Sequence, residues 1–140
     1  KIGLWGGSYG GYLTAMGLAR ASDMFAAGVD IHGVMDWNVI INNFMPSYNP
    51  LEHSDFAKLA YDSSPIAYMD TWRSPVLLIH GDDDRNVPFS ESIDKINALR
   101  KEGVYYEQLV FPDEVHGFLL HRNWVNAYKA TADFFDRMLK

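Results

Sequence analysis

Short apolar runs alternate with helix-patterned segments along the whole chain, and this alternation constrains the fold more than any other feature. The run Pro75–His80 is apolar nearly throughout, which favours a strand that is covered on both faces. Similar short runs predict further strands at residues 2–5, 25–33 and 104–111. Strands that alternate with helices are typical of a parallel sheet with crossover helices. The predicted class is therefore α/β, with a mostly parallel sheet and flanking helices.

Helices are predicted between these strands and after the last one. The first begins at Tyr9 and ends near Arg20. The second lies within residues 87–103, stops at Gly103 and has its apolar stripe at Phe89, Ile93, Ile96 and Leu99. The third lies within residues 123–139, with its stripe at Trp124, Tyr128, Thr131, Phe135 and Met138. Residues 34–73 have only weak periodicity, which indicates short helices.

The size and composition of the chain fit one packed domain. With 140 residues, of which 48% are hydrophobic, it is long enough for one core and too short for two domains. The net charge is −6 and the Lys and Arg residues are scattered, which argues against nucleic acid or anionic lipid as a partner. No apolar run approaches the roughly 18 residues of a transmembrane helix. The chain has no cysteine, so disulfides and thiolate chemistry are excluded.

The chain begins inside a predicted strand, with neither an initiating methionine nor a leader. We therefore expect residues 1–140 to be a single partial domain of a longer protein, with upstream strands missing. The compartment stays open, because a leader would belong to the missing part. A strand that loses its neighbour exposes unpaired backbone groups, so the isolated piece is expected to pair with a second copy as a homodimer or to aggregate.

The stretch LWGGSYGGY, residues 4–12, places Ser8 among four glycines directly after an apolar run. Glycine inside an element costs roughly 0.5–1 kcal/mol relative to alanine, so four glycines need a geometric reason. The G-x-S-x-G nucleophile elbow supplies one, since its sharp strand-to-helix turn lifts the serine hydroxyl above the sheet. We expect Gly6 and Gly10 to avoid clashes that any Cβ would cause in that turn. No Gly-Lys-Ser/Thr sequence follows, which argues against a phosphate-binding loop.

Acidic residues and a histidine follow two later strands. HGDDDRNVP, residues 80–88, comes after the third predicted strand, and FPDEVHGF, residues 111–118, comes after the fourth. The carboxyl ends of parallel strands lie at one edge of the sheet, where ligands bind. The order serine, aspartate, histidine is that of α/β-hydrolases and differs from the chymotrypsin and subtilisin orders. In such a triad the imidazole takes the serine proton, and the acid fixes the tautomer of the imidazole.

The choice of base falls on His116. It lies in the loop after the last strand, between PDEV and Gly117, where a triad base belongs. A lone histidine is more often a structural or surface residue than a catalytic one. That reading applies to the competing histidines, which are His32, His53, His80 and His121.

The choice of acid is open on this evidence. Asp82, Asp83 and Asp84 are adjacent, and a loop of three carboxylates is also typical of a solvated turn. Asp30 is a further candidate, since some hydrolases place the acid after the preceding strand. A metal site that uses these aspartates and the nearby histidines matches no known ligand spacing, so no metal is predicted.

Three motifs, GLWGGSYGGYLTAM, LLIHGDDDRNVPF and FPDEVHGF, resemble the catalytic domain of the prolyl oligopeptidase family of serine peptidases. This family includes dipeptidyl peptidases and acylaminoacyl peptidases, and the resemblance extends over essentially the whole chain. It implies the α/β-hydrolase fold, here its C-terminal portion only, and a peptide substrate without any cofactor. In the family pattern the acid lies four residues after the histidine of the HG pair and four before the proline. Both counts select Asp84.

The resemblance also implies substrate-binding residues. Apolar residues recur every three or four positions at Val34, Trp37, Ile40 or Ile41, and Phe44. That spacing alone is more typical of core packing. In the family, however, this segment lines an apolar pocket for the residue before the scissile bond, and the resemblance adds Tyr9, Asn86 and Val87 to it. An aromatic-lined slot suits proline or another small to medium apolar side chain.

The oxyanion hole of an elbow serine uses the backbone N–H of the next residue, here Tyr9, and a donor from an upstream loop. In the family the second donor is a tyrosine hydroxyl, and neither it nor an N-terminal propeller is in these 140 residues. The predicted function is a serine peptidase with Ser8 as nucleophile, His116 as base and Asp84 as acid. The alternatives are an esterase or lipase, and an inactive hydrolase fold used for binding.

Overall fold

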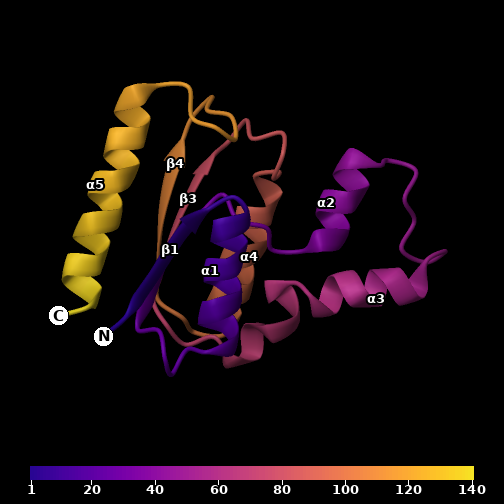
Figure 1. Cartoon of the computed structure of the whole chain (residues 1–140), viewed down its shortest axis with the longest axis horizontal. Coiled ribbons are helices and arrows are strands. Elements are labelled where there is room, and N and C mark those ends of the chain that lie inside the picture. Colours follow the sequence, from indigo (N-terminus) through magenta and orange to yellow (C-terminus); the bar gives the residue numbers. More distant parts are fainter.

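The computed structural model describes all 140 residues, and its centre is a four-stranded sheet (Figure 1). The strands lie side by side in chain order: β1 (Gly3–Gly7), β2 (Ala27–Ile31), β3 (Val76–Gly81) and β4 (Tyr106–Phe111). Every neighbouring pair is parallel, so all four carboxyl ends lie at one edge of the sheet. The predicted parallel α/β class is therefore confirmed, with strand limits within a few residues of those expected.

Helices cover both faces of this sheet (Figure 1). One face carries α1 (Tyr9–Arg20), the 3₁₀ segment η1 (Pro65–Thr71) and α4 (Ser90–Lys101). The other face carries α5 (His121–Met138). The short helices α2 (Trp37–Phe44) and α3 (Ser54–Asp62) project to one side of these layers. None of the helices is long and apolar enough to cross a membrane.

Strand β3 joins the two cores of the protein. Its alternate residues Val76 and Leu78 pack against α1 and α4, whereas Leu77 and Ile79 pack on the side of α5. All six residues of the strand are buried. A continuous apolar run is what such a two-sided position requires, because successive side chains point to opposite faces.

The inward face of α4 differs from the predicted stripe. Ile93 is 46% exposed, whereas Glu91 and Lys95 are almost wholly buried beside Ile96 and Leu99. The helix is rotated because both charged side chains find partners on the loop between β2 and α2. Burying a charged group is tolerable only when such partners are present. The predicted stop is confirmed, since Gly103 follows the helix with a left-handed φ of 69°.

The predicted stripe of α5 is confirmed except at Tyr128, which is 51% exposed. Thr131 is buried, and Trp124, Phe135 and Met138 pack against the core that contains Ala127 and Phe134. The small side chains of Ala127 and Thr131 let the helix lie close to the sheet. Tyr128 instead packs edge-on against the exposed Trp5 of β1, with ring centroids 6.3 Å apart.

Candidate active site

Ser8 occupies a strained turn between β1 and α1. Its φ of 59° lies in the left-handed region, which few residues other than glycine adopt. Its N–H donates to the carbonyl of Ile31, at 2.9 Å, and its carbonyl accepts the N–H of Tyr12, at 3.0 Å. These bonds fix the turn to β2 on one side and to α1 on the other. The turn therefore has the backbone features of the predicted nucleophile elbow.

The glycines of this turn have different roles. A Cβ on Gly6 would lie 2.7 Å from the carbonyl carbon of Gly10, so the strand and the helix can meet only if residue 6 is glycine. The expectation for Gly10 is wrong, because a Cβ there would meet nothing within 4 Å. Strand β1 packs against the backbone of Gly10, whereas the position that a Gly10 side chain would occupy is open. Gly11 is the second crowded position, where a Cβ would lie 2.7 Å from the Ile31 carbonyl.

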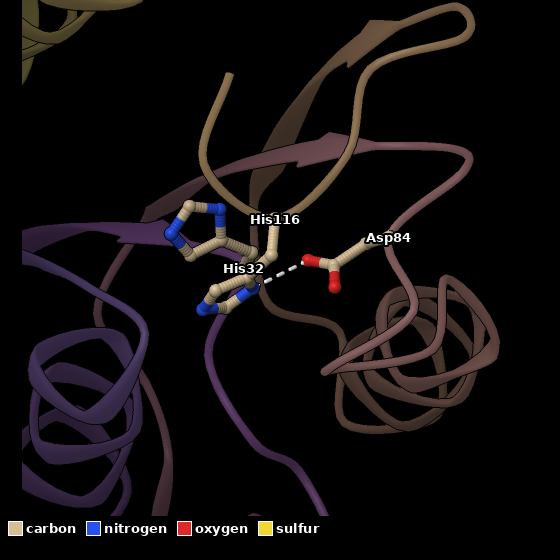
Figure 2. Close-up of side chains that lie close together, drawn as sticks. All are labelled: His32, Asp84 and His116. Carbon is tan, nitrogen blue, oxygen red and sulfur yellow. Dashed lines mark hydrogen bonds and ion pairs between the residues drawn. The ribbon is translucent and has the colours of Figure 1, made fainter. Parts of the chain in front are cut away.

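His116 lies in the loop after β4 and contacts both of its predicted partners. Its Nε2 is 2.7 Å from Ser8 Oγ. Its Nδ1 is 2.7 Å from Asp84 Oδ2, the contact drawn in Figure 2. When Nδ1 carries the proton and donates to Asp84, Nε2 is free to accept the hydroxyl of Ser8. The three side chains thus form one continuous series of hydrogen bonds.

Asp84 lies in the loop after β3 and its carboxylate is buried. Oδ1 accepts the backbone N–H groups of Asn86 and Val87, each at 2.9 Å. Burial by itself raises the pKa of Asp84. Hydrogen bonds from His116, His80 and the Val87 amide outweigh it and hold the pKa of this carboxyl well below its usual range. The group is therefore an anion that faces His116 at neutral pH.

The other candidate acids do not contact His116. Asp30 is buried, but it accepts the N–H of Gly33 and forms an ion pair with Lys95. Asp82 accepts the backbone N–H of Asp113, at 2.7 Å, and is exposed. Asp83 is exposed as well and pairs only with Arg85. Among the four aspartates, Asp84 alone is within hydrogen-bond distance of the histidine.

The remaining histidines have structural positions, with one exception. His80 is buried, with Nδ1 2.7 Å from Ser92 Oγ. Its Nε2 is 2.9 Å from the Val87 carbonyl and 3.2 Å from Asp84 Oδ2, so it supports the carboxylate. His53 stacks on Tyr48 at the start of α3. His121 is exposed at the start of α5. The exception is His32, whose ring lies against that of His116 with centroids 4.2 Å apart (Figure 2).

A cavity of about 210 Å³ opens beside Ser8 and His116. The rest of its lining consists of Tyr9, Val34, Trp37, Ile40, Phe44, Asn86 and Val87. All the residues predicted for an apolar pocket therefore meet there, and of the two candidates Ile40 and Ile41 it is Ile40 that lines it. Ile41 lines a separate apolar groove between α2 and α3.

Two hydrogen bonds hold α2 against this cavity. The N–H of Trp37 donates to Ser64 Oγ, at 2.9 Å, and the amide of Asn43 donates to the Arg85 carbonyl, at 3.1 Å. The Trp37 ring also packs edge-on against Tyr12, with centroids 5.2 Å apart. The aromatic wall of the cavity is thereby attached to both α1 and the loop that carries Asp84.

His32, Asp84 and His116 offer three potential metal ligands within 4.8 Å of one another. Both oxygens of Asp84 already accept hydrogen bonds from the protein. The two imidazole rings lie nearly face to face, tilted by 36°, whereas ligation needs the ring nitrogens of both to point at one ion. The arrangement suits proton transfer between Ser8 and His116 better than it suits metal binding.

Sequence reasoning did not single out two features of this site. The first is the contact of His32 with His116, which joins loops after β2 and β4. The second is the buried pair Glu91 and Lys95, which holds the loop that leads to α2. A polar residue at the end of a central strand is the signal that could have indicated His32. No local signal marks the inward turn of Glu91 and Lys95.

Comparison with known proteins places the chain in a family. The family model described as "Prolyl oligopeptidase family" matches residues 1–140 of this chain. Dipeptidyl aminopeptidase BIII of Pseudoxanthomonas mexicana is 31% identical over 96% of this chain. The acylamino-acid-releasing enzyme of Mus musculus is 28% identical over 83% of it. The chain spans 21% and 18% of the lengths of these two relatives.

Solved structures of similar proteins share the fold. The uncomplexed acylaminoacyl peptidase of Pyrococcus horikoshii is 29% identical, with a TM-score of 0.82 over all of this chain and 24% of its own. An acylaminoacyl peptidase in complex with Z-Gly-Gly-Phe-chloromethyl ketone has the same identity and coverage and a TM-score of 0.84. The layers around the parallel sheet described above are thus those of an α/β-hydrolase.

Proposed function

Because this chain belongs to the prolyl oligopeptidase family, we propose that the protein is a serine peptidase that hydrolyses short peptides through an acyl-enzyme on Ser8. The observation that carries the proposal is the unbroken series of hydrogen bonds from Ser8 through His116 to Asp84. These residues follow three different strands, so their meeting is a property of the whole fold. Dipeptidyl and acylaminoacyl peptidases among the relatives agree with a peptide substrate.

Acylation begins when Ser8 Oγ attacks the carbonyl carbon of the scissile bond. The serine proton passes to His116 Nε2, and the anionic Asp84 stabilises the imidazolium that forms. The tetrahedral intermediate then collapses. Its C–N bond breaks, and the leaving amine takes the proton from Nε2. His116 acts as base and then as acid within one step of the cycle.

The start of α1 supplies a donor for the negative charge of that intermediate. Tyr9 is the first residue of the helix, and the first N–H groups of a helix have no carbonyl partner inside it. The positive end of the helix dipole lies there too, which favours a developing oxyanion. We assign the Tyr9 N–H to the oxyanion hole on this basis.

The apolar cavity beside Ser8 is the proposed pocket for the side chain that precedes the scissile bond. Trp37, Val34 and Val87 give the cavity of about 210 Å³ apolar walls, which suit proline or alanine better than a charged side chain. Asn86 is the one polar wall residue besides Ser8 and His116, and its side chain is proposed to contact the substrate backbone.

The test of this function uses a fluorophosphonate that reacts with activated serines. The intact protein should be labelled on Ser8, and Ser8→Ala should abolish labelling while its stability stays within about 1 kcal/mol. Ser47→Ala, at an exposed serine that does not line the cavity, is the matched control and should be labelled normally. Labelling on another serine, or none at all, would refute the proposal. Turnover of esters but not of peptides would assign the protein to the esterases.

A panel of peptide nitroanilides tests the pocket. Substrates with proline or alanine before the scissile bond should be cleaved in preference to those with lysine there. Trp37→Ala should raise KM for them about 10- to 100-fold, since burial of an apolar side chain contributes roughly 1.5–3 kcal/mol. Phe56→Ala, which alters only the neighbouring groove, is the control. Efficient cleavage after lysine would contradict the apolar pocket.

A further inference from the structure

His32 occupies the space between the nucleophile turn and the ring of His116. It follows β2 directly and is only 5% exposed. Its ring centroid lies 4.2 Å from that of His116, and the rings are tilted by 36° (Figure 2). A Cβ on Gly7 would lie 3.3 Å from His32 Nε2, so the ring is also in contact with the end of β1. His32 therefore lies against His116 and beside the end of the strand that leads to Ser8.

The backbone at His32 limits which residue can place a ring here. Its φ of 42° lies in the left-handed region, and its N–H donates to the Ile79 carbonyl at 2.7 Å. Histidine and asparagine are enriched in that region, whereas bulky apolar residues are strained there. Histidine is thus the ring-bearing residue that this backbone accepts most readily.

The ring of His32 has a polar atom that forms no hydrogen bond within the protein. Nδ1 is buried and has no hydrogen-bond partner. A buried unpaired polar atom is costly and calls for an explanation. Burial, followed by the positive charge that His116 can carry, lowers the pKa of His32 to about 3. The ring is consequently uncharged at neutral pH and offers a π face to His116.

The second half of the proposed reaction makes a special demand on His116. Once Ser8 is acylated, its oxygen has no proton to donate to Nε2. The imidazole then keeps a single in-plane hydrogen bond, to Asp84. Residues 112–120 form neither helix nor strand. Hydrogen bonds to Asp82 and to the carboxylate of Glu114 anchor this loop, but none of them involves the His116 ring.

We propose that His32 is a positioning residue that covers one face of His116 and holds its imidazole in line between Asp84 and the acylated Ser8. This role rests on the proposed function. During deacylation a water oxygen attacks the acyl carbon and its proton passes to Nε2. The bond between the acyl carbon and Ser8 Oγ then breaks, and Oγ takes the proton from Nε2. A contact on the ring face matters most in this step.

Two variants of the intact protein separate the ring from the backbone. His32→Asn keeps a residue suited to the left-handed φ and removes the ring. His32→Phe keeps a ring and puts it on a less favourable backbone. If the backbone were all that mattered, the asparagine variant would be the more active of the two. The positioning role predicts the reverse order.

Turnover of a p-nitrophenyl ester, which reports deacylation, is measured beside the rate of fluorophosphonate labelling, which reports the activation of Ser8. In His32→Asn, kcat for the ester should fall about 10-fold, the scale of one aromatic contact, while labelling slows less than about 3-fold. In His32→Phe, kcat should stay within about 3-fold of wild type. Thermal unfolding of both variants verifies that each is folded.

Three results would overturn the role of His32. The first is wild-type deacylation in His32→Asn, and the second is an equal loss in folded His32→Phe. The third is inhibition by zinc in the wild type but not in His32→Phe, which would make His32 a ligand instead. Labelling of Ser8 in the wild type separates this role from the proposed function. A labelled wild type with no effect of His32→Asn refutes the role alone, and an unlabelled wild type refutes both.

Discussion

Two buried aspartates near the carboxyl edge of the sheet are held in similar ways but have different side-chain partners. One oxygen of each accepts backbone N–H groups, one for Asp30 and two for Asp84, and the other oxygen faces a side-chain nitrogen. For Asp30 that nitrogen is the ammonium of Lys95, at 2.5 Å, which also donates to the Gly33 carbonyl. For Asp84 it is the imidazole of His116, at 2.7 Å, with His80 Nε2 at 3.2 Å.

The difference lies in what the partner does with its other side. Lys95 is 1% exposed, and both of its bonds end inside the protein, on Asp30 of β2 and on the Gly33 carbonyl of the loop that leads to α2. His116 has a second nitrogen, which reaches Ser8 beside the cavity. A buried carboxylate is thus structural or chemical according to whether its partner can pass a proton onward. Burial does not distinguish the two, since Asp30 and Asp84 are both buried.

The largest expected effect is on catalysis at Asp84. Asp84→Asn should lower kcat on the order of 10⁴-fold, because an amide favours the wrong tautomer of His116 and no longer stabilises the imidazolium. Peptide turnover by the folded variant measures the loss. Asp30→Asn should leave kcat of its folded fraction within about tenfold. A larger loss at Asp30 than at Asp84 would reverse the comparison.

The next largest effect is on stability at Asp30. Asp30→Asn leaves the ammonium of Lys95 buried without a counter-ion, which should destabilise the fold by about 3–5 kcal/mol. Denaturant unfolding measures this change. The double variant Asp30→Asn with Lys95→Met removes both charges and should recover at least half of the loss. No recovery would mean that the pair is not an independent unit.

A third buried carboxylate, that of Glu91, extends the comparison to the pH dependence of stability. Glu91 accepts the N–H groups of Met35 and Asp36, yet its Oε2 has no partner. Burial is the main cause that raises the pKa of Glu91 from 4.5 to about 7. The folded protein therefore keeps a proton that the unfolded chain releases between about pH 4.5 and 7. Within that window the contribution of Glu91 to stability must fall as the pH rises.

The measurement compares wild type with Glu91→Gln across this range. The unfolding free energy of the wild type, relative to that of Glu91→Gln, should fall by up to about 3 kcal/mol between pH 4.5 and 7 and then stay level. The lowered pKa of His32 has the opposite slope, but it is common to both proteins and cancels. A difference that does not change with pH would show that Glu91 is ionised throughout.

The smallest expected effects belong to the exposed neighbours of Asp84. Asp82→Asn and Asp83→Asn should each change kcat less than about tenfold, since neither carboxylate contacts His116. The same peptide assay measures them. A loss at Asp83 comparable to that at Asp84 would mean that the acid had been misassigned.

The sheet and the arrangement of the site were predictable because their signals are local. An apolar run such as Val76–Gly81 indicates a strand by itself, and the carboxyl-edge rule then brings the following loops together. The turn at Ser8 was visible because a short motif specifies it. The choice of Asp84 needed the family resemblance, since three adjacent aspartates look alike in sequence.

The inward face of α4 and the place of His32 were not predictable in this way. Lys95 is 65 residues from Asp30, so its burial depends on a partner that no local pattern indicates. Likewise, the open space at the side-chain position of Gly10 depends on the path of β1, which the motif alone does not indicate. Hydrophobic periodicity assumes that polar residues face water, and it fails where polar residues pair inside the protein.

The order of the strands has a consequence for synthesis on the ribosome. Neighbours in the sheet are neighbours in the chain, but Ser8 comes first and His116 comes 108 residues later. At a translation rate of about 5–20 residues per second, the serine emerges roughly 5 to 20 seconds before the histidine. Ser8 of the nascent chain is an ordinary alcohol until β4 aligns beside β3. On the proposed function, hydrolytic activity appears only when that last strand is in place.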